Sequence, residues 1–465
     1  MSKKYFPGLR FSLFLAAAFL ALLVGVGFRG AAHAAATAEL WQKVYEADNS
    51  GLPKTAAEHL KEIYKISLAE KKYGEALKAI SKQVVSECNI AGNKPEEKIK
   101  RLEQEILTAA DEMKPLMRAI LAQWYWHYFS RNRYRFMNRA RTAGLDEKDF
   151  TTWDLPKLFN HISAIHQKLI ADSERFKTIK ISEFSDVIEK GTASEKLRPT
   201  LYDFIMQRAL EFYTSGEQAG AQPQDAFEIR ADSDAFADSV KYISYSPETT
   251  DTSSAKLAAV KIFQALLAFH QNDGDKDAYL DIDIQRLNYI KNISTGEAKT
   301  EIYIKRVKEI AEEYKTLEPG DLARYYWANE VNTAGDHAGA VKIAEGASSQ
   351  STYGGALCAN LIASVKAKAV SIKAEKSVPS GREFEIDVNY KNIDSVAFRA
   401  YRQNWKDYIK DRGRRNFNWI EHDEIRDVLS SAPEAEWSSP LSPTADYKAV
   451  DAKIKSPALK PGFYI

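Results

Sequence analysis

Residues 53–90 read PKTAAEHLKEIYKISLAEKKYGEALKAISKQVVSECNI. Apolar residues recur in this stretch at helical spacing, once after Pro53 and again from Tyr73 onward. The two apolar faces consist of Ala57, Leu60, Tyr64 and Leu68, and of Tyr73, Ala76, Leu77, Ile80 and Val84. The joint between them, residues 70–74, is short and polar. Two amphipathic helices joined so closely pack as an antiparallel hairpin, so the stretch predicts a helical hairpin.

Helical spacing continues on both sides of this hairpin and predicts a helical array over residues 37–363. No fixed period recurs, which favours an irregular α-solenoid or helical-hairpin array over a regular repeat. Residues 216–238 and 244–254 are polar and predict loops. The further expected helices are 116–129, 155–170, 201–213, 257–269, 280–290, 302–314, 322–331 and 337–343.

The period changes to strict alternation after Ser364. Half-buried strands are expected at 370–374, 384–390 and 395–401, and again at 447–454 and 460–465. Residues 403–443 are charged and irregular and predict an insertion. Five strands at most are expected, whereas a β-sandwich needs about seven. The fold class is therefore multidomain α then β, in which residues 366–465 form an incomplete antiparallel β-sandwich. A sheet that ends in this way would leave one apolar strand edge unpaired, which natural proteins avoid. The chain is therefore expected to be a fragment of a longer product.

The N-terminus has the pattern of a secretory signal peptide, assigned to residues 1–34. Lys3, Lys4 and Arg10 precede an uncharged apolar run from 11 to 28, and small residues at 32 and 34 precede a cleavage site. An uncleaved anchor is the alternative, because about eighteen apolar residues can just cross a bilayer. Cleavage is expected, giving an exported protein of the periplasm or cell surface without stable membrane insertion.

The composition excludes several classes of function. The net charge is +1, with 65 basic and 64 acidic side chains, so nothing indicates nucleic acid as a partner. Cys88 and Cys358, the two cysteines, fall in separate helical segments. In a helical array each unit contacts only its neighbours, so the two cysteines are not expected to meet. Two buried free thiols are therefore expected rather than a disulfide. No zinc-type spacing occurs, and no cofactor or metal is expected.

Three local patterns resemble functional sites but are interpreted as structural. The aromatic run 124–129 could stack bases or sugars, but such a cluster is typical of helix packing. Residues 273–277 resemble the start of a calcium loop, but lack its glycine (Ala278) and its final glutamate (Ile284). His161 and His166 are five positions apart and miss a common helical face. No catalytic constellation can be assembled, so no enzymatic activity is expected.

Four stretches resemble the N-terminal region of the large bacterial alpha-2-macroglobulin-like proteins. They are WQKVYEADNSGLPKT (41–55), DFTTWDLPKL (149–158), RPTLYDFIMQRAL (198–210) and DYKAVDAKIKSPALKPGFY (446–464). The last is similar to the closing strands of the family's first macroglobulin-type β-domain. The resemblance implies that residues 366–465 are a truncated domain of this macroglobulin or Ig-like type.

The resemblance also implies a function, endopeptidase inhibition or protease trapping in the cell envelope by a longer parent protein. Many members carry a thioester within a Cys-x-Glu-Gln motif, which neither Cys88 nor Cys358 begins. The family's bait segment would lie beyond Ile465. The chain is thus expected to be an N-terminal scaffold whose partners are proteins: peptidases through the parent, and other envelope proteins. The alternative is a free-standing exported helical-repeat module that binds proteins.

Overall fold

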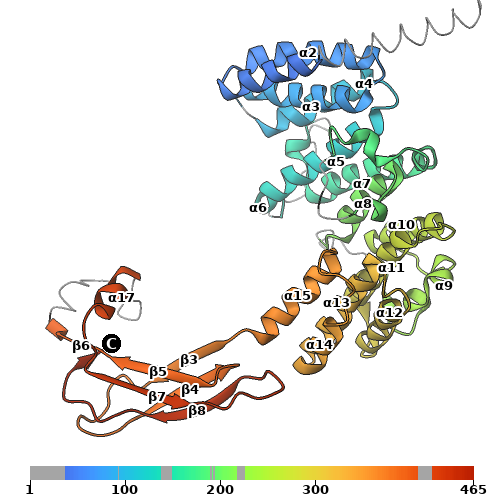
Figure 1. Cartoon of the computed structure of the whole chain (residues 1–465). Coiled ribbons are helices and arrows are strands. Elements are labelled where there is room, and N and C mark those ends of the chain that lie inside the picture. Colours follow the sequence, from blue (N-terminus) through green and yellow to red (C-terminus); the bar gives the residue numbers. More distant parts are fainter. Residues whose placement is uncertain are drawn as a thin grey trace, which may run out of the picture. The chain divides into compact units, whose positions relative to one another are not determined.

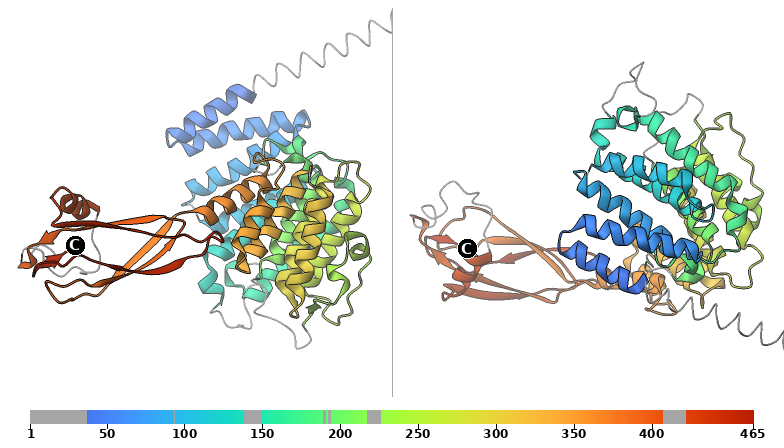
Figure 2. Two further views of the ribbon diagram at one scale, coloured as in Figure 1. Left: turned by 60° about the horizontal axis from the view of Figure 1, so that its bottom comes forward. Right: turned by 90° about the horizontal axis from the view of Figure 1, so that it is seen from above.

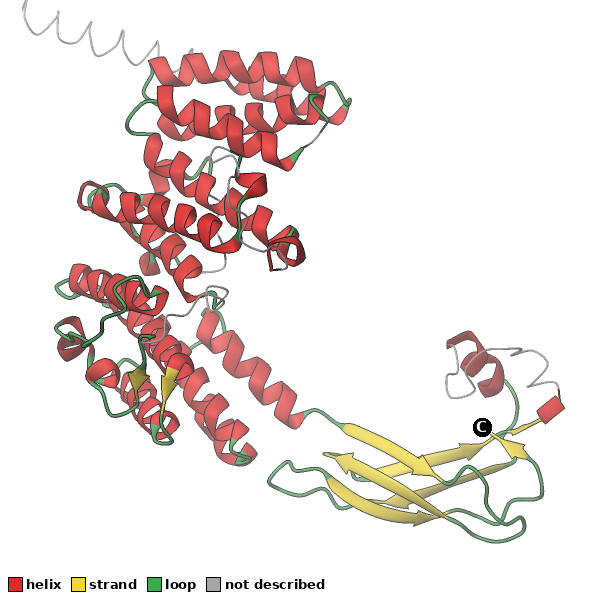
Figure 3. Cartoon of the chain, turned by 180° about the vertical axis from the view of Figure 1, so that it is seen from behind, coloured by secondary structure: helices red, strands yellow, loops and turns green. Residues whose placement is uncertain are grey.

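The structure is a computed structural model that describes residues 37–92, 94–137, 149–188, 191, 194–216, 226–406 and 422–465. Its helices come first in the chain and its antiparallel sheets follow in the C-terminal part (Figures 1 and 3). The expected order of α then β is confirmed. The expected signal peptide, 1–34, lies outside the described residues. By contacts the chain divides into two units, residues 1–295 and 296–465. The division falls inside the stretch expected to be one helical array.

All of the helices expected from periodicity are present, with ends within a few residues of the predicted ones. Helix α1 covers residues 37–49. The others in the first unit are α2 (Pro53–Ala69), α3 (Tyr73–Ile90), α4 (Pro95–Thr108), α5 (Lys114–Arg131), α6 (Arg133–Met137), α7 (Leu155–Ala171), α8 (Leu201–Thr214), α9 (Ser239–Ile243), α10 (Ala255–His270) and α11 (Asp277–Ile293). Strand β1 (Ile229–Arg230) lies within the expected loop 216–238 and pairs in parallel with β2 (Ser294–Thr295), which follows α11.

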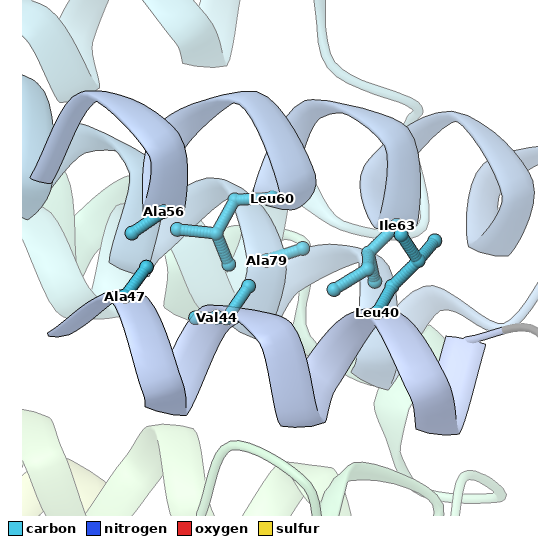
Figure 4. Close-up of a cluster of buried hydrophobic side chains, with 7 residues drawn as sticks. All are labelled: Leu40, Val44, Ala47, Ala56, Leu60, Ile63 and Ala79. Atoms are coloured by element: carbon cyan, nitrogen blue, oxygen red, sulfur yellow. The ribbon is translucent and has the colours of Figure 1, made fainter. Parts of the chain in front are cut away.

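The predicted hairpin of α2 and α3 is present, and α1 packs against it. In the right view of Figure 2 these first helices lie side by side. Small and branched side chains from all three helices meet in one buried cluster, drawn in Figure 4. Its members are Leu40, Val44, Ala47, Ala56, Leu60, Ile63 and Ala79. The alanines allow the helix backbones to approach, and the aliphatic side chains fill the space between them.

The second unit begins with four helices: α12 (Lys299–Glu313), α13 (Glu318–Thr333), α14 (His337–Ala344) and α15 (Tyr353–Lys366). Helix α15 crosses α13 at Gly354, where an added Cβ would lie 2.2 Å from the backbone nitrogen of Leu322. Next to this crossing the buried carboxylate of Asp321 accepts hydrogen bonds from the Ser348 amide (2.7 Å) and the Thr352 hydroxyl (2.9 Å). The glycine therefore allows the two helices to cross closely. The hydrogen bonds to Asp321 hold the residues before α15 next to α13.

The strands form a three-stranded sheet in the order β3–β4–β8 and a two-stranded sheet of β5 and β7. Their bounds are β3 (Ala369–Ala374), β4 (Glu385–Lys391), β5 (Ser395–Ala400), β6 (Arg402–Gln403), β7 (Ala435–Pro440), β8 (Val450–Lys455) and β9 (Phe463–Tyr464). Strands β6 and β9 pair just beyond the end of β5. One buried cluster takes side chains from both sheets, with Ile386, Val388 and Tyr390 facing Val396 and Phe398.

Part of the segment expected to be an insertion, 403–443, belongs to a sheet. It contains strand β7, which pairs along the whole of β5, and helix α17 (His422–Leu429). The strand escaped prediction because Trp437 is its one large apolar residue. Its ring stacks on that of Phe398, with centroids 5.1 Å apart. The expected limit of five strands is therefore too low.

Hydrogen bonds connect the turn between β4 and β5 to the end of helix α15. The side-chain amide of Asn392 donates to the carbonyl oxygens of Val365 (2.9 Å) and Ala367 (3.0 Å) at the end of α15. Asn392 itself has a positive φ of 58°, which asparagine tolerates better than most residues. These bonds satisfy carbonyl groups that the helix end would otherwise leave open.

Candidate protein-binding groove

The predicted joint between α2 and α3 forms one wall of a groove in the first unit. Helix α2 ends at Ala69, and Lys71 follows with a φ of 57°, a left-handed conformation that reverses the chain. The amide of Lys72 donates to the carbonyl oxygen of Ser67 (2.9 Å), which closes the turn. Both lysines line the groove.

The groove has a volume of about 460 Å³ and is open to solvent. Three separate parts of the first unit line it: the start of α1, the α2–α3 joint with the start of α3, and the 3-10 turn η3 (Ile181–Phe184) with the residues after it. The lining residues are Thr37, Ala38, Trp41, Lys71, Lys72, Tyr73, Gly74, Glu75, Lys78, Glu183, Phe184 and Asp186.

Trp41 is held in place by its neighbours while part of its ring stays exposed. Its indole nitrogen donates to Glu75 Oε1 at 2.9 Å, and Ser67 Oγ donates to the other oxygen of the same carboxylate at 2.8 Å. The ammonium group of Lys78 lies 4.7 Å from the centroid of the Trp41 ring, within the range of a cation–π interaction. A tryptophan fixed in this way can contact a partner at little cost in side-chain entropy.

Gly74 allows the far wall of the groove to come close. A Cβ at this position would lie 2.9 Å from the backbone oxygen of Glu183. That distance is too short for an ordinary contact, so a larger residue would push η3 away from α3. The groove also mixes three lysines with three acidic residues. Aromatic side chains among charges of both signs suit a protein partner better than a polyanion.

A second, smaller groove lies between α7, α8 and α10. Its volume is about 230 Å³, and it is lined mainly by apolar side chains. Met206, Ile262 and Tyr213 contribute to its surface, and Lys261 is its one basic residue. It lacks the acidic residues of the first groove and therefore provides a comparison surface of different character.

Most of the aromatic run at 124–129 packs against neighbouring helices, as predicted, whereas His127 is exposed. Tyr125 and Phe129 are buried on α5, and the Tyr125 ring meets those of Phe150 and His161 edge to face, with centroids 5.0 and 4.9 Å apart. The hydroxyl of Tyr125 donates to Glu103 Oε1 at 2.7 Å. The rings thus stabilise the contacts of α5 with its neighbours rather than face solvent as a platform.

The segment at 273–277 is a turn between α10 and α11, as predicted. The Asp273 carboxylate is hydrogen-bonded to His270 Nδ1. Asp277 is buried and is the first residue of α11. The ammonium group of Lys196 lies 3.5 Å from Asp275 Oδ2 and 3.9 Å from Asp277 Oδ2. In the described part of the chain, no group of three or more histidine, cysteine or acidic side chains could hold a metal ion.

The two histidines of α7 are packed separately. His166 is buried against Phe212, with ring centroids 5.4 Å apart. Burial and the nearby Arg208 guanidinium lower the pKa of His166 to about 4, so it is neutral at pH 7. Burial likewise lowers the pKa of His161, against the opposing effect of Glu103. Both are structural, in agreement with their interpretation as core or surface residues.

Cys88 and Cys358 are free, buried thiols, as predicted. Burial raises the pKa of Cys88, and it raises that of Cys358 to about 11. The thiol of Cys358 faces the backbone oxygen of Asp321 at 3.8 Å. A buried thiol with a raised pKa is protonated at neutral pH and is a poor nucleophile.

The sequence did not indicate Trp41 as a site residue, because its partner Glu75 and the groove wall at Glu183 are distant from it in the chain. The polar joint at 70–74 was the one signal available.

None of the helices in the described residues is both long enough and apolar enough to cross a bilayer. No protein-family model matches this chain, and no curated protein matches it.

Proposed function

We propose that this chain is the N-terminal scaffold of an exported alpha-2-macroglobulin-like protein whose parent function is endopeptidase inhibition in the cell envelope. Three features support the proposal: the signal-peptide pattern at 1–34, the order of helices followed by antiparallel sheets, and the four stretches that resemble the family. In this view the chain carries no catalytic residues. It binds proteins and positions the domains that trap the peptidase.

The proposal includes a finer description of the fold. The helical part is an irregular α-solenoid, which is supported by the packing of successive helices in pairs such as α2 with α3 and α12 with α13. The strands form an incomplete macroglobulin-type β-sandwich. This is supported by the single buried cluster that joins the β3–β4–β8 sheet to the β5–β7 sheet.

The size of the native product tests the scaffold proposal. An antibody against the helical region should detect, in extracts of the source organism, a band several times heavier than the 52.4 kDa of this chain. The gene product should then contain a Cys-x-Glu-Gln motif or a bait segment downstream. A single band at or just below 52.4 kDa would contradict the scaffold role and leave the free-standing module.

A second candidate function is a free-standing exported module that binds proteins. The groove lined by Trp41 and the α2–α3 joint favours it, because that groove needs no further domain to be complete. Arrays of helices commonly bind peptides and proteins on such surfaces. The two functions share the groove and differ in whether the chain belongs to a longer parent whose other domains trap peptidases.

Substitutions in the groove should abolish capture of a partner. We expect Trp41→Ala and Lys71→Glu each to weaken binding at least about tenfold, the effect of losing one central interface side chain. The measurement is retention of envelope proteins on the immobilised chain, with the partner identified by mass spectrometry and its affinity then determined. Circular dichroism confirms that each variant is folded.

Lys261→Glu in the second groove is the matched control, since it makes the same charge change on a different surface. It should leave the affinity unchanged. If Lys261→Glu weakens binding and Lys71→Glu does not, the second groove is the interface and the assignment of the first is wrong. A captured non-peptidase partner would favour the free-standing module.

A further inference from the structure

A small cavity lies between helices α5, α7 and α8 of the first unit, which Figure 1 shows as neighbours. Its volume is about 50 Å³, several times the roughly 10–15 Å³ that a single water molecule requires. The short side chains of Ala119 and Ala122 leave this room, and the rings of Trp126 and Phe212 form apolar walls. The cavity therefore has space for an ion or a molecule of a few atoms, and is too small for a sugar or a peptide segment.

A buried imidazole lines this cavity without a hydrogen-bond partner. His166 of α7 is only 4% exposed. Its ring belongs to the core and stacks on that of Phe212, but its Nδ1 has no partner among the described residues. Buried side-chain nitrogens in native proteins nearly always have a partner. The imidazole therefore indicates a ligand in the cavity.

The guanidinium of Arg208 lines the same cavity and is held in place by its neighbours. Its Nη2 donates to Glu211 on the next turn of α8, and its Cζ lies 5.5 Å from the centroid of the Phe204 ring. Its Nε is buried and finds no acceptor in the described part of the chain. Arginine can only donate hydrogen bonds. A ligand that satisfies this Nε must therefore supply an acceptor.

The charge around the cavity favours a negative ligand. Arg208 acts together with burial to lower the pKa of His166 to about 4, so the positive charge of the guanidinium reaches the imidazole. Glu211 is the one acidic residue that lines the cavity, and its side chain is 57% exposed. Solvent therefore screens the charge of Glu211. An anion would also accept a hydrogen bond from His166 Nδ1, since a neutral imidazole can carry its hydrogen there.

We propose that this cavity binds one small monovalent anion such as chloride, with Arg208 Nε and His166 Nδ1 as its donors. A divalent anion would exceed the charge that one guanidinium, already paired with Glu211, can balance in a buried place. The bound anion would lie among α5, α7 and α8 and stabilise their packing. This site is separate from the groove and does not depend on the proposed function.

The binding of chloride to the whole chain is tested by chlorine-35 NMR, in which the signal of the free ion broadens when the ion exchanges with a site on a slowly tumbling protein. Sodium gluconate, whose anion is too large for the cavity, keeps the ionic strength constant. We expect an excess line width that decreases as chloride saturates the site. Bromide should remove this excess by competition, whereas gluconate should not.

Three variants locate the site. Arg208→Gln removes the charge and the Nε donor and should weaken chloride binding at least about tenfold. Arg230→Gln makes the same change at an exposed arginine paired with Asp232 and should leave binding unchanged. Ala122→Val fills the cavity while keeping both donors, and should also weaken binding at least about tenfold. Circular dichroism checks the fold of each variant, and either of the two site variants is informative if the other fails to fold.

The protonation of His166 provides a readout that a water molecule in the cavity would not change. The titratable groups near its ring come from α8: Arg208 and Glu211 at the cavity, and Tyr213 with its ring centroid 6.2 Å away. A bound anion stabilises the imidazolium, so the pKa of His166 should be about one unit higher in chloride than in gluconate at the same ionic strength. NMR of the ring proton, assigned by comparison with His166→Gln, measures this difference. Arg208→Gln should abolish it.

Three results would overturn the proposal. One is the absence of any excess line width that bromide removes, and another is the same pKa of His166 in chloride and in gluconate. Either would show that the cavity holds water only. The third is chloride binding that survives both Arg208→Gln and Ala122→Val, or that Arg230→Gln weakens equally, which would place the ion elsewhere on the chain.

Discussion

Replacing Arg286 with methionine is expected to lower the free energy of unfolding by about 3–5 kcal/mol. The guanidinium is fully buried on α11 and donates from Nε to Asp283 Oδ1 at 2.9 Å, with a second bond from Nη2 to the same oxygen. Its Nη1 donates to the backbone oxygens of Ala235 (2.7 Å) and Ala237 (3.1 Å). Tyr242 covers it, with the ring centroid 4.4 Å away.

Methionine keeps most of the stem but leaves the Asp283 carboxylate and two carbonyl groups buried without their donor. Urea denaturation followed by circular dichroism measures the loss. The double variant Arg286→Met with Asp283→Leu should recover much of it, because both charges are then absent. Arg230→Gln removes an arginine from an exposed pair with Asp232 and should leave the midpoint unchanged. A loss below about 1 kcal/mol in Arg286→Met would show that the buried network contributes little.

The helices could be predicted because the residues that specify each helix lie within or directly beside it in the sequence. The expected segment 201–213 corresponds to α8, Leu201–Thr214, where a periodic apolar face coincides with a capping box formed by Thr200 and Asp203. Strands β4 and β5 were predicted for the same reason, since buried and exposed side chains alternate strictly along them. Such patterns need no knowledge of distant residues.

The polar interactions could not be predicted because their partners are distant in sequence. Arg286 contacts backbone atoms 49 and 51 positions earlier, and in the sequence it resembles any charged residue of an amphipathic helix. Strand β7 was missed because its inward positions are mostly small or polar and gain their burial from β5. The groove likewise depends on η3, more than a hundred residues after Trp41, approaching Gly74.

His270 is expected to make the stability of the first unit depend on pH. It is buried at the end of α10, and its two ring nitrogens lie 2.7 Å from Asp203 Oδ1 and 2.6 Å from Asp273 Oδ2. A histidine that bonds a carboxylate at each nitrogen is best satisfied as the doubly protonated cation, which donates twice. Burial by itself lowers the pKa of His270, but the two carboxylates outweigh it and the net pKa is raised.

Because the folded pKa of His270 lies above the unfolded value near 6.5, its contribution to stability is complete below pH 6.5 and is lost as the pH rises through the folded pKa. We therefore expect the free energy of unfolding of the wild type to fall as the pH rises above 6.5. His270→Gln should lose about 3 kcal/mol at pH 6, since it leaves the buried Asp203 without its cation.

The difference between wild type and His270→Gln isolates this contribution from the other groups that titrate over the same range. That difference should shrink steadily as the pH rises. His127→Gln, at an exposed position on α5, should match the wild type at every pH. A difference that is constant or grows with pH would mean that His270 is neutral in the folded protein. The interaction with Asp203 would then be an ordinary hydrogen bond, whose contribution of about 1 kcal/mol does not change with pH.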